Sequence, residues 1–292
     1  MRPLTLLHVA VLAVACTKSA PSPATGADSG APDDAAVDAA DAGVPDVEPE
    51  VVLSSCDAPI ASPPATLALD PFYTKYLDAD GIPIVSSPKP DDRALRVACR
   101  ITRQMISFRA DVRAQMIAHH ARVAVMAKTE VTTDIPEHAD LYTAFPGTDW
   151  NKRARGLGGT VDRPATSCAE ENLLCDATDP YVGENILVHE FSHGMVNLGV
   201  AFADKTFVSR LKAAYDAAIA AGNWKNTYAG SNADEYFAEG AQDYFDTNIE
   251  SIPSNGIHNE INTREELAAY DPKLSALTAE LFGPERWTPT CP

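Results

Sequence analysis

The spacing of apolar residues between positions 81 and 127 predicts two strands separated by helical structure. Residues 81–87 form a short apolar run that is closed by two prolines, which is typical of a strand or extended segment. From Asp91 to about His120, apolar residues recur three or four positions apart, as on one face of a helix. The run Arg-Val-Ala-Val-Met-Ala at 122–127 is rich in β-forming residues and predicts a central strand.

Helical periodicity dominates the second half of the chain. The glycine-rich segment at 156–161 is expected to hold a short strand, because glycine allows another backbone or a ligand to approach closely. Longer helices are expected at 185–198, 207–221, 233–247 and 274–282. There is no internal repeat. The order of these elements predicts an α+β fold with a mostly helical C-terminal half.

The segment His-Glu-Phe-Ser-His at 189–193 is an H-E-x-x-H motif within one of the expected helices. His189 and His193 are four residues apart, so they face the same side of a helix and can bind one zinc ion. Glu190 lies between them, where it can act as general base toward a zinc-activated water. A chain of this length contains the motif by chance roughly one time in a hundred, so its interpretation depends on the residues further along the chain.

A later helix carries a second pair of charged residues, Glu235 and Glu239, which are also four positions apart. A catalytic zinc has three protein ligands and one open position, and a carboxylate is a common third ligand. Histidine ligands also donate their other N–H to an oxygen partner. Asn232, three residues before Glu235, is a typical helix N-cap. We therefore expect Glu235 to bind the zinc and Glu239 to orient a ligating histidine.

This combination resembles the gluzincin metallopeptidases, in which H-E-x-x-H is followed by E-x-x-x-D or E-x-x-x-E on a later helix. The segment Glu-Tyr-Phe-Ala-Glu at 235–239 is most similar to the catalytic domain of anthrax lethal factor and its bacterial and fungal relatives. The interval from His193 to Glu235 is of the right order for that group. Tyr228, seven residues before Glu235, lies where the lethal-factor pattern has a tyrosine that stabilises the oxyanion or protonates the leaving amine.

The resemblance is tight over residues 181–247 and looser over the flanking parts of residues 66–287. In the looser part, His258 and Arg264 are candidates to line a substrate cleft. The resemblance does not extend to residues 1–55. It implies a zincin-like catalytic domain over residues 56–292 that binds one zinc ion.

Other zinc-peptidase patterns do not fit the chain. The extended motif H-E-x-x-H-x-x-G-x-x-H requires glycine and histidine at the positions of Val196 and Gly199. The inverted motif H-x-x-E-H is absent. The residues alone leave three further candidates for the third zinc ligand, which are Asp234, Glu239 and His258.

The N-terminus predicts export. Arg2 is followed by an apolar run at 4–14, which is typical of a signal segment and too short to span a membrane as a mature helix. Cys16 directly follows small residues and resembles the end of a bacterial lipobox, so residues 1–16 predict a lipidated Cys16. Plain cleavage near Ala15, giving a secreted protein, is the alternative. The expected location is the bacterial cell envelope or surface, with membrane contact only through the lipid.

Residues 17–55 are rich in Ala, Asp, Pro, Gly and Ser and lack aromatic residues, which predicts a disordered tether. The formal net charge of the whole chain is −18. The tether contributes −7 and Arg2 contributes +1, so −12 remains for residues 56–292. An acidic folded part argues against a nucleic-acid partner and against binding to anionic lipid.

Export permits disulfide bonds. Cys168 and Cys175 flank a short polar loop just before the expected zinc helix, and their pairing would brace the entry to the site. Cys56 and Cys291 could join the two ends of the domain, which would leave Cys99 as a buried thiol. Pairing of Cys56 with Cys99 is the alternative, and the sequence does not decide between these arrangements.

These observations predict an exported zinc metalloendopeptidase that acts on a peptide or protein. Two other interpretations are a surface lipoprotein binding module with a non-catalytic zinc site and a zinc amidase that acts on cell-wall peptides. Glu190 favours an enzyme, because a structural zinc site does not need a general base.

Overall fold

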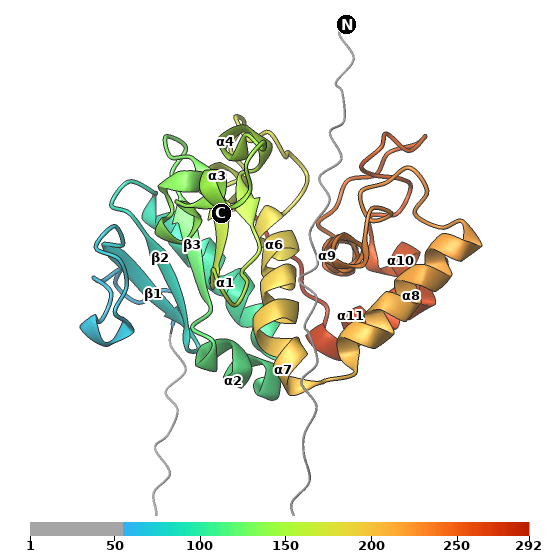
Figure 1. Cartoon of the computed structure of the whole chain (residues 1–292), viewed down its shortest axis with the longest axis horizontal. Helices are drawn as coiled ribbons and strands as arrows, with labels where there is room; N and C mark the ends of the chain where they lie inside the picture. The colour runs from blue at the N-terminus through green and yellow to red at the C-terminus, as the bar shows by residue number, and fades with distance from the viewer. Residues whose placement is uncertain (1–54, 292) are drawn as a thin grey trace, which may run out of the picture. The chain divides into compact units, whose positions relative to one another are not determined.

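The computed structural model describes residues 55–291, and Figure 1 shows a sheet in the first half of this part and helices in the second. The expected signal segment, Cys16 and all but the last residue of the expected tether lie outside the described residues. The sequence-based prediction of an α+β organisation with a mostly helical second half is confirmed.

Five strands form one mixed sheet in the order β1-β2-β3-β5-β4. The central pairs β2–β3 and β3–β5 are parallel, whereas β1 and β4 pair antiparallel at the two edges. The strand bounds are β1 Lys75–Ala79, β2 Ile82–Ser86, β3 Arg122–Met126, β4 Gly156–Leu157 and β5 Ala165–Ala169. Every residue of β2 and β5 is buried, as expected for parallel strands that are covered on both faces.

The predicted strands in 81–87 and 122–127 and the short strand in 156–161 are confirmed. β1 and β5 were not predicted. The sequence of β5 is Ala-Thr-Ser-Cys-Ala, which is too small and polar to stand out as a strand. Its pairing with β3, and not its own residue preferences, places it in the sheet.

The predicted helical segment from 91 to 120 consists of two helices, α1 (Asp92–Ile106) and α2 (Ala110–Ala118). The helix breaks at Ser107, whose backbone N–H bonds the carbonyl of Gln104 and ends α1. Asp91 caps the start of α1 by accepting a hydrogen bond from the backbone of Arg93. α1 packs against β1 and β2 on one face of the sheet.

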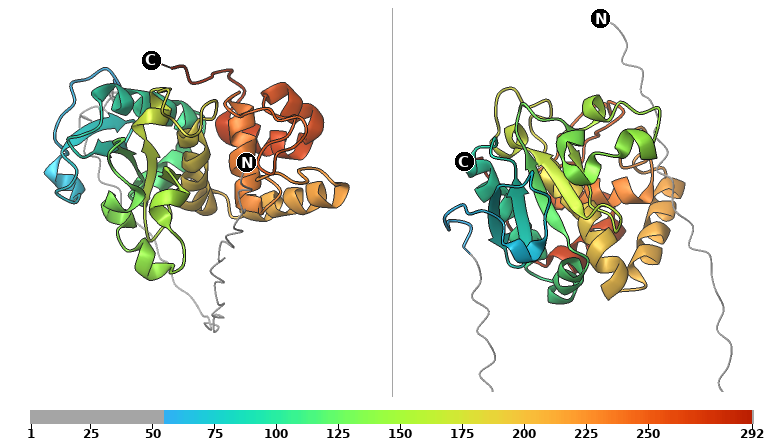
Figure 2. Two further views of the ribbon diagram at one scale, coloured as in Figure 1. Left: turned by 90° about the horizontal axis from the view of Figure 1, so that it is seen from above. Right: turned by 60° about the vertical axis from the view of Figure 1, so that its left-hand side comes forward.

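Helix α6 lies between the sheet and the C-terminal helices (Figures 1 and 2). It packs against β5 on one side and α9 on the other. It contributes Leu187, Val188, Phe191 and Met195 to a hydrophobic core that extends from the sheet to the last helix. The main helices of this half are α6 Ile186–Met195, α8 Phe207–Ala221, α9 Ala233–Tyr244, α10 Arg264–Tyr270 and α11 Pro272–Phe282.

The predicted helix 185–198 begins where expected, with Asn185 as its N-cap, but α6 ends at Met195. A π-helical turn, η4 (Val196–Val200), follows α6 and leads into the short α7 (Ala201–Ala203). The remaining short elements are η1 Ala65–Leu67, η2 Thr132–Asp134, η3 Pro136–His138, α3 Leu141–Ala144, α4 Trp150–Arg153 and α5 Glu170–Leu173.

The disulfides differ from the expected pairs. Cys56 pairs with Cys99, and Cys175 pairs with Cys291, while Cys168 is a buried free thiol. The predicted Cys168–Cys175 pair is wrong. Cys168 is buried in β5, and the short helix α5 separates it from Cys175. The Cys56–Cys291 pair is also wrong, and the alternative Cys56–Cys99 is confirmed.

Two disulfides are characteristic of an extracellular or exported protein. In Figure 2 the end of the chain leaves the helical half and returns toward the sheet, where Cys291 meets Cys175. None of the helices in the described part of the chain is both long and apolar enough to cross a membrane.

A buried histidine supports the edge strand β4. His138 is 1% exposed, and its Nε2 lies 3.0 Å from the hydroxyl of Ser167 in β5. The same hydroxyl accepts a hydrogen bond of 3.1 Å from the backbone N–H of Leu157 in β4. Burial lowers the pKa of His138 to about 4, so the imidazole is neutral in the folded protein at neutral pH.

This shift predicts acid destabilisation. The unfolded histidine has an ordinary pKa near 6.5, so the unfolded chain binds more protons between pH 6.5 and 4. Stability from the neutral imidazole is complete above pH 6.5 and falls as the pH drops toward 4. Through His138, the free energy of unfolding is about 2 kcal/mol lower at pH 5 than at neutral pH. Urea unfolding at pH 7.5 and pH 5, with a chelator present, should show a smaller pH difference for His138→Gln than for the parent chain. Equal pH differences would contradict this assignment.

Candidate metal centre

Two capped helices place the motif residues opposite one another. Asn185 caps α6 by accepting a hydrogen bond from the backbone of Val188, and His189 and His193 follow on the face that packs against α9. The expected N-cap of α9 is confirmed, because Asn232 accepts hydrogen bonds of 2.9 Å from the backbone N–H groups of Asp234 and Glu235. Glu235 therefore lies in the first turn of α9 and faces α6.

Three potential ligand atoms from these residues form a small triangle. Nε2 of His189 and Nε2 of His193 are 3.3 Å apart, and Oε2 of Glu235 lies 3.0 Å from the first and 3.2 Å from the second. Within the described residues, His189, His193 and Glu235 thus bring three potential ligand atoms close enough together to bind one metal ion.

The donor set fits zinc. Tetrahedral zinc binds nitrogen and oxygen at about 2.0–2.1 Å, which separates neighbouring ligand atoms by roughly 3.3 Å. The three edges of the triangle are close to that value. Two histidine nitrogens and one carboxylate oxygen are also the donor types of a catalytic zinc with one position left open.

Hydrogen bonding holds the carboxylate of Glu235 in its charged form, against the effect of burial. Burial would raise the pKa of Glu235, but its hydrogen bonds with His189 and His193 lower that pKa well below its usual range. Burial would likewise lower the pKa of His189, and its hydrogen bonds with Glu235 and Glu239 raise it. The charged carboxylate is the form that binds a cation.

The far nitrogen of His189 has two oxygen neighbours. Nδ1 lies 2.8 Å from Oε1 of Gln242 and 3.3 Å from Oε1 of Glu239. The structure thus brings Glu239 beside the histidine that it was expected to orient, but Gln242 is the closer acceptor. Sequence reasoning missed Gln242, although it lies seven residues after Glu235, which is two helical turns along the same face of α9.

Glu190 lies beside the triangle without belonging to it. It is half-buried on α6, and the edge strand β4 packs close to it: a β-carbon at Gly156 would lie 3.0 Å from Cγ of Glu190. Burial raises the pKa of Glu190. A carboxylate whose pKa is moved toward neutrality is suited to exchanging protons with a reacting group.

Tyr228 reaches the same group from the segment between α8 and α9. Its hydroxyl donates a hydrogen bond of 2.9 Å to Oε1 of Glu235, and its ring stacks on His189 with centroids 6.1 Å apart. Its backbone N–H bonds the carbonyl of Ile257 at 2.8 Å. Burial raises the pKa of Tyr228, so the hydroxyl keeps its proton and can donate it.

The other candidates lie outside the triangle. Asp234 is exposed on α9. His258 is buried and its Nε2 lies 3.2 Å from Oε1 of Glu184, while its Nδ1 has no partner among the described residues. His258 neighbours Ile257, which bonds Tyr228, so it lies near the group without joining it.

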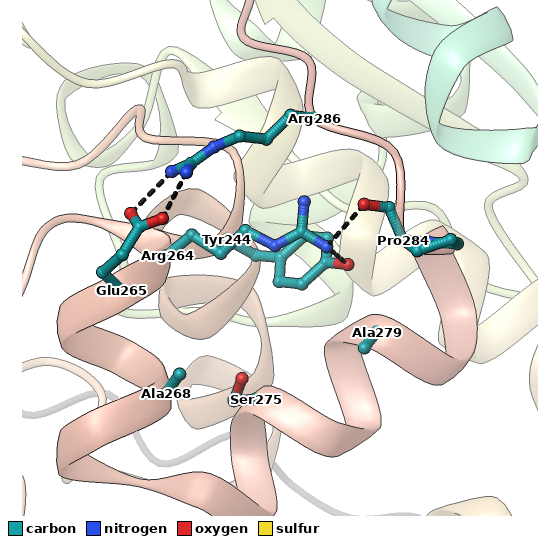
Figure 3. Close-up of a pocket in the computed structure, with 8 residues that line it drawn as sticks. All are labelled: Tyr244, Arg264, Glu265, Ala268, Ser275, Ala279, Pro284 and Arg286. Carbon is teal, nitrogen blue, oxygen red and sulfur yellow. Dashed lines mark hydrogen bonds and ion pairs between the residues drawn. The ribbon is translucent and has the colours of Figure 1, made fainter.

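Arg264 is not at the metal group, so its expected place in a substrate cleft is not supported. Figure 3 shows its guanidinium over the ring of Tyr244, at 3.7 Å from the ring centroid, and toward the carbonyl of Pro284. Arg264 also bonds the carbonyls of Gly283 and Glu285. The surrounding cavity of about 440 Å³ is lined by residues of α9, α10, α11 and the C-terminal segment, and none of the three ligand residues lines it. Arg264 holds the end of α11 in place.

No protein-family model matches this chain, and the comparison with curated proteins gives no match. Among solved structures, a similar one is the PRO-PRO endopeptidase (PPEP-2) from Paenibacillus alvei. The two share 15% sequence identity with a TM-score of 0.45, over 68% of this chain and 96% of that one.

Proposed function

We propose that this chain is an exported zinc-dependent metallopeptidase that hydrolyses peptide bonds. The observation that carries the proposal is the triangle of His189, His193 and Glu235 with edges of 3.0–3.3 Å, beside which Glu190 and Tyr228 lie. Within this proposal the fold is zincin-like and the site is of the gluzincin type, as the order of H-E-x-x-H and E-x-x-x-E along the chain suggests.

The proposed chemistry is divided among a few side chains. His189, His193 and Glu235 would hold one zinc ion, which supplies a Lewis acid that polarises a carbonyl and lowers the pKa of water. Glu190 would accept a proton from the attacking water and pass it to the leaving amine. The hydroxyl of Tyr228 would donate a hydrogen bond to the oxyanion of the substrate.

The neighbouring acceptors would keep the histidine in place. Gln242 and Glu239 accept from Nδ1 of His189, which fixes the tautomer and leaves Nε2 toward Glu235 and His193. Gln242 is fully buried, so this contact is protected from competing water.

A lipid anchor on Cys16, following the signal segment, is part of the proposal. The two disulfides in residues 55–291 are consistent with an exported protein. Lipidation would hold the catalytic part at the bacterial surface through the tether, and a non-lipidated, secreted form is the alternative.

Cleavage of a mixed peptide library by the zinc-loaded chain tests the proposal. We expect metal-dependent cleavage that a chelator abolishes and that zinc restores. Release of stem peptides from cell-wall fragments, without cleavage of ordinary peptides, would replace the peptidase by an amidase. One bound zinc with no cleavage of either substrate would favour the binding module.

Replacing Tyr228 by Phe should lower kcat by about ten- to a thousandfold, because one donor to the oxyanion is removed while the ring stacked on His189 stays. Zinc content should stay at one ion per chain. Steady-state kinetics on the best library peptide measure the effect. Tyr215→Phe is a matched control, since it removes a hydroxyl that bonds the carbonyl of Gly230 in the same segment. A kcat within twofold of the parent for Tyr228→Phe would exclude a catalytic role for its hydroxyl.

A further inference from the structure

Arg153, at the end of the short helix α4, is a cation without an anionic partner among the described residues. Most described arginines pair with a carboxylate, as Arg155 does with Glu171 and Arg163 with Asp140. The guanidinium of Arg153 makes no hydrogen bond or ion pair within residues 55–291. It lies over the ring of Trp150, whose centroid is 5.4 Å from Cζ. Its side chain is exposed.

The backbone around Arg153 is fixed by its neighbours. The carbonyl of Ala154 accepts a hydrogen bond of 2.6 Å from the hydroxyl of Thr132. The side chain of Asn151 accepts from the backbone of Thr133 at 3.1 Å. Arg155 is held against Glu171 at 2.7 Å. The backbone is therefore anchored on both sides of Arg153, which fixes the point from which its side chain extends.

This anchored segment leads directly to the metal centre. Three residues after Arg153, Gly156 packs against Glu190, with its would-be β-carbon 3.0 Å from Cγ of that glutamate. β4, which contains Gly156, also contacts α6. Arg153 therefore lies at the approach to the carboxylate that the proposed mechanism uses as general base.

Apart from Glu190, the carboxylates that border the centre are already engaged. Glu235 and Glu239 bond the histidines, and Glu184 pairs with His258. A guanidinium binds a carboxylate through two parallel hydrogen bonds, and this is its strongest common interaction. In a chain with a net charge of −18, an arginine without such a partner beside a reactive centre is suited to an anion that arrives with the substrate.

Resting on the proposed peptidase function, we propose that Arg153 binds a carboxylate of the substrate next to the scissile bond. The preferred substrates then carry an Asp or Glu side chain, or the free C-terminal carboxylate, within a few residues of the cleaved bond. Arg153 determines specificity, and the reaction itself is performed by the residues of the metal centre.

Matched peptides test this assignment on the full chain. The starting point is a library peptide that the chain cleaves. At each position near the cleaved bond, a peptide with Glu or Asp is compared with one that has Gln or Asn. Each peptide is made with a free and with an amidated C-terminus. We expect the acidic peptide to exceed its neutral partner in kcat/KM by roughly tenfold or more at one position. Arg153→Gln should reduce this ratio to about one, and Arg153→Glu should invert it. Loss of the preference on C-terminal amidation identifies the terminal carboxylate, and loss with Gln or Asn identifies the side chain.

Lys152→Gln is the matched control, because Lys152 is the adjacent cation on α4 and pairs with Asp149 at 3.0 Å. It should keep the parental ratio. An equal preference for acidic and neutral peptides in the parent, or an unchanged preference in Arg153→Gln, would overturn the assignment and leave the peptidase function standing.

Binding measurements distinguish a failure of the proposed carboxylate site from a failure of the proposed peptidase function. Fluorescence anisotropy of the same labelled peptides with the zinc-loaded Glu190→Gln variant needs no turnover. An acid preference in binding that Arg153→Gln abolishes supports the carboxylate site even where no peptide is cleaved, and then the peptidase function alone fails. The absence of any acid preference in binding overturns the site.

Discussion

Replacing Glu190 by Gln should abolish peptide hydrolysis while the chain still binds one zinc ion. The carboxylate lies beside the ligand triangle and contributes no atom to it, so its loss leaves the three ligand atoms in place. Gln has nearly the same shape but cannot accept the proton of the attacking water. General acid–base catalysis contributes about 10²–10⁴-fold to rates, so kcat should fall by at least that factor. Kinetics with saturating peptide and elemental analysis of the same sample measure both quantities.

Asp234→Asn provides the matched control for this prediction. It makes the same change from acid to amide at an exposed residue that adjoins Glu235 on α9. Both kcat and zinc content should stay at the parental values, which also removes Asp234 as an alternative ligand. Parental turnover by Glu190→Gln would show that the mechanism is wrong, and loss of zinc from that variant would show that Glu190 belongs to the ligand set.

The parts of the site that depend on helix geometry could be predicted from the sequence. His189 and His193 share a face because four residues make about one turn, and Asn232 caps α9 because its side chain accepts from the backbone two and three residues ahead. The spacing within each helix does not determine how two helices pack. The expectation that Glu235 faces the histidines came from the third ligand that a catalytic zinc requires and from the resemblance to the gluzincins.

Features that depend on distant segments were not predictable in this way. Gln242 meets His189 across the α6–α9 contact, and no pattern within either helix requires that meeting. Arg153 lies on a four-residue helix with no periodicity to detect, and its relation to Glu190 depends on where β4 joins the sheet. The disulfide of Cys175 with Cys291 depends on the course of the last segment. In each case, tertiary packing decides which side chains meet.

Replacing His193 by Ala should remove zinc binding, together with the stabilisation that zinc provides. Nε2 of His193 bonds His189 and Glu235, and its ring has no further hydrogen-bond partner among the described residues. Its loss therefore deletes one ligand and little else. His189 is less suitable for this test, because its loss would leave the buried Gln242 and Glu239 without their partner.

The expected effect of His193→Ala is large. At a free zinc concentration a thousand times the parental Kd, binding stabilises the folded chain by about 4 kcal/mol. If the lost ligand weakens binding a thousandfold, the same zinc concentration adds only about 0.4 kcal/mol. Thermal unfolding with zinc and with a chelator should therefore show a large shift in Tm for the parent and almost none for the variant.

His258→Asn alters a buried histidine outside the triangle and should keep the parental zinc shift. A full zinc shift in His193→Ala would place the ion elsewhere, and loss of the shift in His258→Asn would make His258 a ligand.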